Sequence, residues 1–169
     1  EQIFKKMIAS YEATADPDIK PNVHTANAVC NACAFTKIEE DRSVALKIAF
    51  GVFEWIVSQP DMEPDSYTYT ILLSVCANLL PRENYQARFQ HAKELFEQCC
   101  AGGYVNEFVL RKLRQTVSTD EYIALTGTRG ETTTDNLPHS WTRSFGHFAR
   151  VQVNKGRKKN SGWSQRRRK

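Results

Sequence analysis

Two stretches of this sequence align without a gap at an offset of 43 residues: PNVHTANAVCNACA at residues 21–34 and PDSYTYTILLSVCA at residues 64–77. A second pair recurs at the same offset, with AFGVFE at residues 49–54 and AKELFE at residues 92–97. Two elements that recur at a fixed period of roughly 20–50 residues are typical of helical-repeat proteins. The chain is therefore predicted to contain two whole repeats, at residues 23–65 and 66–106.

Each recurring element has the apolar spacing of an α-helix. In the second repeat the apolar face recurs every three or four residues, at Thr68, Ile71, Leu72, Val75 and Cys76. Pro21 and Pro64 stand just before the first helix of each repeat, where the missing N–H of proline does least harm. No alternating strand pattern of useful length is present. The predicted fold is all-α, an α-solenoid of antiparallel helix pairs.

The repeats do not account for the whole chain. Residues 1–22 are similar to the end of an incomplete repeat, which predicts that the chain is a piece of a longer array. Residues 107–126 are predicted to form capping helices. Residues 127–169 are predicted to be a linker and a basic, largely disordered tail, because Gly, Thr and charged residues replace the apolar pattern.

Charge is distributed unevenly along the 169 residues. The net charge of +4 divides into −5 for residues 1–126 and +9 for residues 127–169. A basic tail on an acidic body favours an anionic partner for the tail, and the alternative is a solvated tail with no specific partner. No run of about 18 apolar residues occurs, so no contact with a membrane through a spanning helix is expected.

The cysteines do not form a recognisable metal site or disulfide framework. Their number, five, is odd, and the chain has enough apolar residues for a core of its own. Cys30 and Cys33 have the spacing of a metal-binding or redox pair, but Cys76, the repeat equivalent of Cys33, has no such partner. Cys33 is therefore predicted to be a small buried residue between helices. Without a phosphate-binding loop, nucleophile motif or metal motif, no cofactor and no enzymatic activity are predicted.

The same residues carry a resemblance to a known family. Pro followed by Asn or Asp, then a helix with Asn27 or Thr70 at its fifth residue, then a second helix with Ala-x-x-apolar-Phe-Glu, resembles the pentatricopeptide repeat. The resemblance covers about residues 1–116. Both whole repeats are longer than is usual for the family, and the extra residues, around Lys37–Arg42 and Asn78–Tyr85, are expected to form loops between helices.

The resemblance implies that the first helix of each repeat lines a concave face that binds single-stranded RNA, about one base per repeat. It assigns base reading to Asn27 with Asp65, to Thr70 with Asn106, and to Asn22, which closes the incomplete first repeat. By the family's pairing pattern, the first pair prefers uracil and the second prefers adenine. The alternative is that these residues only cap helices, as Asn, Asp and Thr commonly do.

Further RNA contacts follow from the same resemblance. The second residue of each repeat, His24 or Tyr67, is expected to stack on a base or to be a partly buried edge of the helix stack. Arg111 stands at the fifth residue of the last element, where the family has Asn, Thr or Ser. This departure predicts that the last element caps the helical array and does not read a base. The cations of the tail are expected to follow the RNA backbone without reading bases: Lys155, Arg157, Lys158, Lys159, Arg166, Arg167, Arg168 and Lys169.

The function predicted in this way is sequence-selective binding of single-stranded RNA in organellar RNA processing, stability or translation. By family resemblance the location is the mitochondrion or the plastid, and other RNA-processing or ribosomal proteins are possible partners. One alternative is a protein-interaction scaffold of the tetratricopeptide type, whose Trp, Leu-Gly and Tyr positions the first helices lack. A second alternative is a structural protein associated with the organellar ribosome.

Overall fold

A computed structural model describes residues 2–81, 83–129 and 133–144. Within these ranges the chain is helical and contains no strand, which confirms the predicted all-helical class. The elements are α1 (Gln2–Thr14), the short 3-10 helix η1 (Pro17–Ile19), α2 (Val23–Ala34), α3 (Arg42–Ser58), α4 (Ser66–Leu79), α5 (Tyr85–Gly102), α6 (Glu107–Thr116), α7 (Thr119–Thr126) and the 3-10 helix η2 (Thr134–Asn136). Residues 139–144 are again helical. None of the described helices has the length and the hydropathy needed to cross a membrane.

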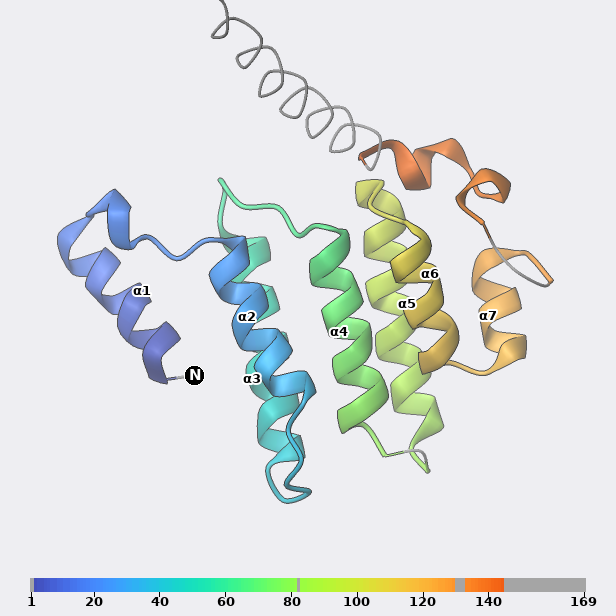
Figure 1. Cartoon of the computed structure of the whole chain (residues 1–169), viewed down its shortest axis with the longest axis horizontal. Helices are drawn as coiled ribbons and strands as arrows, with labels where there is room; N and C mark the ends of the chain where they lie inside the picture. The colour runs from blue at the N-terminus through green and yellow to red at the C-terminus, as the bar shows by residue number, and fades with distance from the viewer. Residues whose placement is uncertain (1, 82, 130–132, 145–169) are drawn as a thin grey trace, which may run out of the picture.

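Helices α2, α4 and α6, which we call the first helices, lie side by side, and α3 and α5 lie behind them (Figure 1). α2 packs against both α3 and α4, and α4 packs against both α5 and α6. Most of the residues expected to form loops separate α2 from α3 and α4 from α5, whereas Asn78 and Leu79 belong to the end of α4, and Arg42 and Tyr85 begin α3 and α5. The arrangement is repeat-like, with each helix pair adding one member to the row of first helices.

Each first helix begins at an Asn or Asp cap. The side-chain Oδ1 of each cap accepts the backbone N–H three residues on, at 2.8–2.9 Å: Asn22 from Thr25, Asp65 from Thr68, and Asn106 from Val109. Such a cap satisfies one of the free N–H groups at a helix start and contributes about 1 kcal/mol of stability. The backbone N–H of Asp65 also donates to the hydroxyl of Thr68, which completes a capping box.

The 43-residue offset of the sequence has a counterpart in burial. Cys33 and Cys76 are both buried, and so are Phe53 and Phe96. The largest fully buried side chains include Phe96 and several aliphatic residues of α4, α5 and α6. Equivalent sequence positions therefore supply equivalent parts of the core.

Hydrogen bonds also tie each first helix to the one before it. Nδ2 of Asn78, near the end of α4, donates to the carbonyl oxygen of Ala34 at 2.9 Å. Oγ1 of Thr116, at the end of α6, donates to the carbonyl oxygen of Leu73 at 3.2 Å. A polar side chain near the C-terminal end of a first helix thus bonds to the backbone of the preceding first helix in both steps of the row.

Residues 133–144, which composition assigns to the linker, pack against the helices. The Trp141 ring meets the edge of Phe96 with ring centroids 5.7 Å apart, and the Trp141 carbonyl accepts the Val105 N–H at 2.9 Å. The Ser144 N–H donates to the Gly103 carbonyl at 3.0 Å. The packed body therefore continues past residue 126. The Trp141 ring, the buried Leu137 side chain, and hydrogen bonds from the backbone and from the side chains of Arg143 and Ser144 hold this segment.

Replacing Trp141 with alanine should loosen this segment. The half-buried ring contributes apolar contact to Phe96, so we expect Trp141→Ala to lower the free energy of unfolding by about 2 kcal/mol. Urea denaturation measures this change. Hydrogen exchange of the Val105 N–H should become faster in the variant, and an unchanged exchange rate together with unchanged stability would contradict the packing described here.

Candidate nucleic-acid interface

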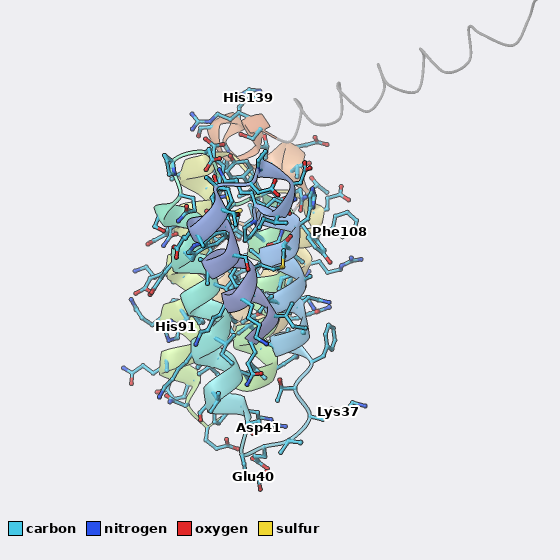
Figure 2. The ribbon with its side chains drawn as sticks, turned by 90° about the vertical axis from the view of Figure 1, so that its left-hand side faces the viewer. Lys37, Glu40, Asp41, His91, Phe108 and His139 are labelled. Carbon is cyan, nitrogen blue, oxygen red and sulfur yellow. The ribbon has the colours of Figure 1, made fainter. Side chains whose placement is uncertain are left out.

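The exposed surface of the first helices carries a row of aromatic rings. The second residue of α2, α4 and α6 is His24, Tyr67 and Phe108 respectively, and all three are exposed. The exposed fraction is 55% for Tyr67 and 59% for Phe108. Figure 2 shows Phe108 on the side of the first helices and His91 of α5 on the opposite side. We call His24, Tyr67 and Phe108 the aromatic row.

Two further rows of hydrogen-bonding side chains follow the aromatic row toward the C-terminal ends of the first helices. The fifth residues of the first helices are Asn27, Thr70 and Arg111, and the ninth residues are Asn31, Ser74 and Gln115. The second, fifth and ninth residues of a helix share one stripe, because three and seven residues are nearly whole turns. On α4 the stripe is half-exposed, and its hydroxyls donate to the helix itself: Thr70 to the Ser66 carbonyl at 2.7 Å, and Ser74 to the Thr70 carbonyl at 2.8 Å.

Asn27 departs from this pattern. Its exposed fraction is 1%, and neither its Nδ2 nor its Oδ1 has a hydrogen-bond partner among the described residues. A buried polar group without a partner costs about 1–3 kcal/mol. The side chain predicted to read a base therefore lies below the surface, with its hydrogen-bonding capacity unused.

Asn22 and Asp65 are helix caps, as the alternative interpretation expected, but the cap occupies only one atom of each side chain. Oδ1 of Asp65 accepts both the N–H and the hydroxyl of Thr68, each at 2.8 Å. Oδ1 of Asn22 accepts the same two groups of Thr25, at 2.9 and 3.1 Å. Oδ2 of Asp65 and Nδ2 of Asn22 take no part in these bonds, so capping and ligand contact use different atoms.

Asn106 and the tail complete the set of predicted RNA-binding residues. Asn106 caps α6 and is 5% exposed, so the protein itself covers its side chain. The predicted backbone-binding cations, at residues 155–169, lie outside the described residues. The structure thus brings His24, Tyr67, Asn22, Asp65 and Thr70 to the surface of the first helices, and it buries the other two base-reading candidates.

Formal charge on the first helices is confined to α6. α2 and α4 contain no Asp, Glu, Lys or Arg, whereas α6 contains Glu107, Arg111, Lys112 and Arg114. The Arg111 guanidinium lies 5.1 Å from the centroid of the Phe108 ring, and Arg114 lies 5.9 Å from the ring centroid of Tyr122. Positive charge on this face therefore begins at the third helix of the row.

The cysteine pair has a packing role. Sγ of Cys30 donates to the Ala49 carbonyl at 3.5 Å, and all five cysteines are buried free thiols. Burial raises the pKa of the Cys30, Cys76 and Cys100 thiols to about 12. Protonated thiols are poor nucleophiles and poor metal ligands. Within the described residues no group of three or more His, Cys, Asp or Glu side chains is placed to hold a metal ion.

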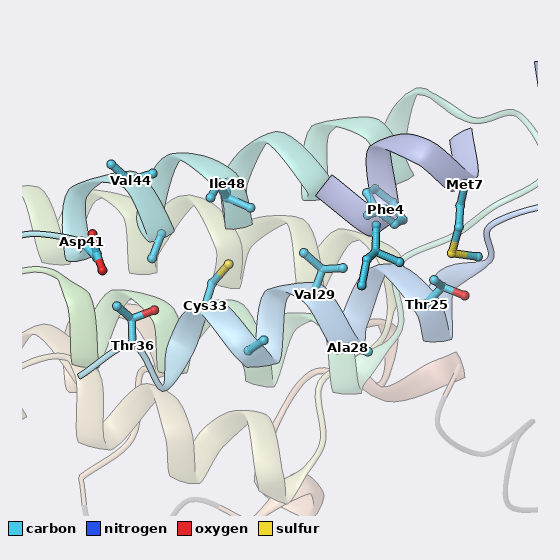
Figure 3. A pocket seen from close by; sticks show the side chains of 13 residues that line it. Phe4, Met7, Thr25, Ala28, Val29, Cys33, Thr36, Asp41, Val44 and Ile48 are labelled. Atoms are coloured by element: carbon cyan, nitrogen blue, oxygen red, sulfur yellow. The ribbon is translucent and has the colours of Figure 1, made fainter. Parts of the chain in front are cut away.

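An open apolar groove of about 550 Å³ lies at the other end of the row, between α1, α2 and α3 (Figure 3). Its α2 wall consists of Thr25, Ala28, Val29, Ala32 and Cys33. The repeat equivalents of these residues on α4, which are Thr68, Ile71, Leu72, Val75 and Cys76, are all buried within the helices. The groove therefore has the chemistry of helix packing and few groups that would orient a polar ligand.

The sequence analysis missed Phe108. Its equivalence to Tyr67 becomes visible when the three caps are aligned, because the step from Asp65 to Asn106 is two residues shorter than the step from Asn22 to Asp65.

Comparison of the chain with known protein families, curated proteins and solved structures found no match. The surface of the first helices is therefore the feature of the chain that bears on its function.

The chain offers its own replacement for Asn27. Thr70, at the equivalent place of α4, bonds to the carbonyl four residues back, and a threonine at residue 27 would find the Val23 carbonyl in the same way. We expect Asn27→Thr to raise the free energy of unfolding by about 1 kcal/mol, because it removes two unpaired polar atoms. Chemical denaturation measures the change, and the reverse swap, Thr70→Asn, is the control. A loss of stability in Asn27→Thr would show that the side-chain amide of Asn27 has hydrogen-bond partners in solution.

Proposed function

We propose that the chain binds single-stranded RNA on the surface of α2, α4 and α6, and that its helix pairs form a segment of an α-solenoid. The observation that carries this proposal is the aromatic row, in which three successive first helices present an exposed ring at the same place. Aromatic rings stack on unpaired bases at about 1–3 kcal/mol for each base. A duplex does not offer its base faces, so the partner is single-stranded.

The polar groups around Tyr67 supply a means of base selection. Asp65, the cap of α4, lies two residues before Tyr67 in the sequence, and Thr70 lies three residues after it, about one turn along the helix. The Asp65 carboxylate only accepts hydrogen bonds, whereas the Thr70 hydroxyl donates or accepts. A base stacked on Tyr67 and contacting Oδ2 of Asp65 would be one with an N–H on its pairing edge, such as uracil or guanine.

The surfaces of α2 and α4 carry little charge, which suits the same ligand. Neither helix contains an Asp, Glu, Lys or Arg, and the carboxylate of the Asp65 cap stands at the start of α4. Hydroxyl and amide side chains instead favour contact with base edges. The resemblance to pentatricopeptide repeats supports a role in RNA processing, stability or translation in a mitochondrion or plastid. The proposed activity is binding, with no chemical step.

Tyr67→Ala tests the aromatic row. We expect this substitution to weaken the binding of single-stranded RNA by a factor of about 5–100, the equivalent of losing one stacked base. Fluorescence anisotropy with labelled oligonucleotides at low salt measures the affinity. The matched control is Tyr85→Ala, which removes a tyrosine that is 69% exposed on α5. Equal affinities for single-stranded and duplex RNA, or equal losses in both variants, would contradict the proposal.

Asp65→Asn separates capping from base reading. Asn and Asp cap helices about equally well, so we expect the free energy of unfolding to change by less than about 0.5 kcal/mol. The base preference of the first repeat, which the family's pairing pattern assigns to Asn27 with Asp65, should move from uracil toward adenine, because an amide adds donors to an acceptor-only group. Selection from a randomised RNA pool measures the preference. An unchanged preference with unchanged stability would leave Asp65 as a cap alone.

A further inference from the structure

We propose that Phe108 and Arg111 of α6 form a third nucleotide-binding unit, in which the ring stacks on a base and the guanidinium pairs with the adjoining phosphate. This inference rests on the proposed RNA binding and specifies how α6, a helix that the sequence predicted to be a cap, takes part in it through a base and a phosphate contact. The ligand of the unit is an unpaired nucleotide carrying a phosphodiester. A cap would only cover the end of the core, whereas this unit makes α6 part of the binding surface.

Helix α6 occupies the same structural place as the two first helices before it. It begins at an Asn cap, as α2 does, and it packs against α4 as α4 packs against α2. The Thr116 hydroxyl bonds to the backbone of α4, and the Asn78 amide bonds to the backbone of α2, although the two side chains stand at different positions of their helices. The second residue of α6 therefore continues the row of His24 and Tyr67, and that residue is Phe108.

The Phe108 ring is exposed, and the Arg111 guanidinium lies over one of its faces, which leaves the opposite face for a base. The exposed fraction of Phe108 is 59%, slightly more than the 55% of Tyr67, and it lies on the side of the first helices in Figure 2. A capping helix at the end of a helical array is expected to carry polar side chains on its outer surface. An exposed aromatic ring in line with two others instead gives a strand of RNA a third surface on which a base can stack.

Arg111 adds what the two neighbouring helices lack. Its side chain is exposed and its guanidinium lies 5.1 Å from the Phe108 ring centroid, close enough for a cation–π contact. A guanidinium held against a ring has its orientation restricted, and its N–H groups match phosphate oxygens in pairs. Because α2 and α4 contain no Lys or Arg, this contact supplies the phosphate neutralisation that the first two helices cannot.

The experiment measures how RNA affinity depends on oligonucleotide length and on salt in single-substitution variants of the whole chain. The test variants are Phe108→Ala, Arg111→Gln and Arg111→Lys. The matched controls are Tyr85→Ala, which removes an exposed ring from α5, and Lys47→Gln, which removes an exposed cation from α3. Anisotropy is measured with single-stranded oligonucleotides of increasing length, and circular dichroism verifies that each variant is folded.

We expect the affinity of Phe108→Ala for long oligonucleotides to fall by a factor of about 5–100, and to stop rising with length one nucleotide earlier than in the parent chain. Arg111→Gln should reduce the slope of log K against log salt by about 0.7, the effect of one phosphate contact on a single strand. Arg111→Lys should keep the salt slope and lose part of the affinity, because an ammonium group does not pair with phosphate in a planar fork.

The outcomes distinguish this inference from the proposed function. If the parent chain binds single-stranded RNA and Tyr67→Ala weakens it, while Phe108→Ala and Arg111→Gln behave as their controls do, α6 is a cap and the inference is wrong. If the parent chain binds no single-stranded RNA at all, the proposed function itself is wrong. If Phe108→Ala weakens binding but Arg111→Gln leaves the salt slope unchanged, the phosphate contact is wrong and the unit as proposed is overturned.

Discussion

The burial of α4 between its neighbours is the constraint on which the other helices depend. Leu72, Leu73, Val75 and Cys76 of this helix are each 0% exposed, and α4 packs against α2, α3, α5 and α6. Burying one such aliphatic side chain contributes about 1.5–3 kcal/mol. Because α4 contacts other helices around most of its circumference, only a narrow stripe of its surface is exposed to solvent. This stripe is the part of the candidate interface that contains Tyr67 and Thr70.

The Asn and Asp caps connect that packing to the candidate site. A cap determines the residue at which a helix begins, and the start of the helix determines which residues share the exposed stripe. Capping at Asn22, Asp65 and Asn106 therefore places an aromatic ring at the same height on three helices. The two interpretations of these residues from sequence, capping and ligand contact, are compatible at Asn22 and Asp65, because each role uses its own side-chain atom.

The two whole repeats differ in the burial of their fifth residue, and this difference alters the surface that the first helices present. Asn27 is 1% exposed, whereas Thr70 is half-buried and bonds to its own helix. Asn27 keeps a hydrogen-bonding group in the core without a partner, at a cost in stability. Protein cores rarely retain such a group unless a ligand, a partner or an altered side-chain position uses it.

By itself the sequence determined the helices, their caps, the 43-residue offset and the burial of equivalent cysteines and phenylalanines. These features follow from local rules, since helix period, capping and chain breaks depend on residues only a few positions apart. Only the tertiary structure decided that Asn27 is buried, that the Phe108 ring is exposed, and that Trp141 holds residues 133–144 against Phe96. Each of these depends on which side of a helix faces a neighbour, or on contacts between residues about 40 positions apart, and no local pattern contains that information.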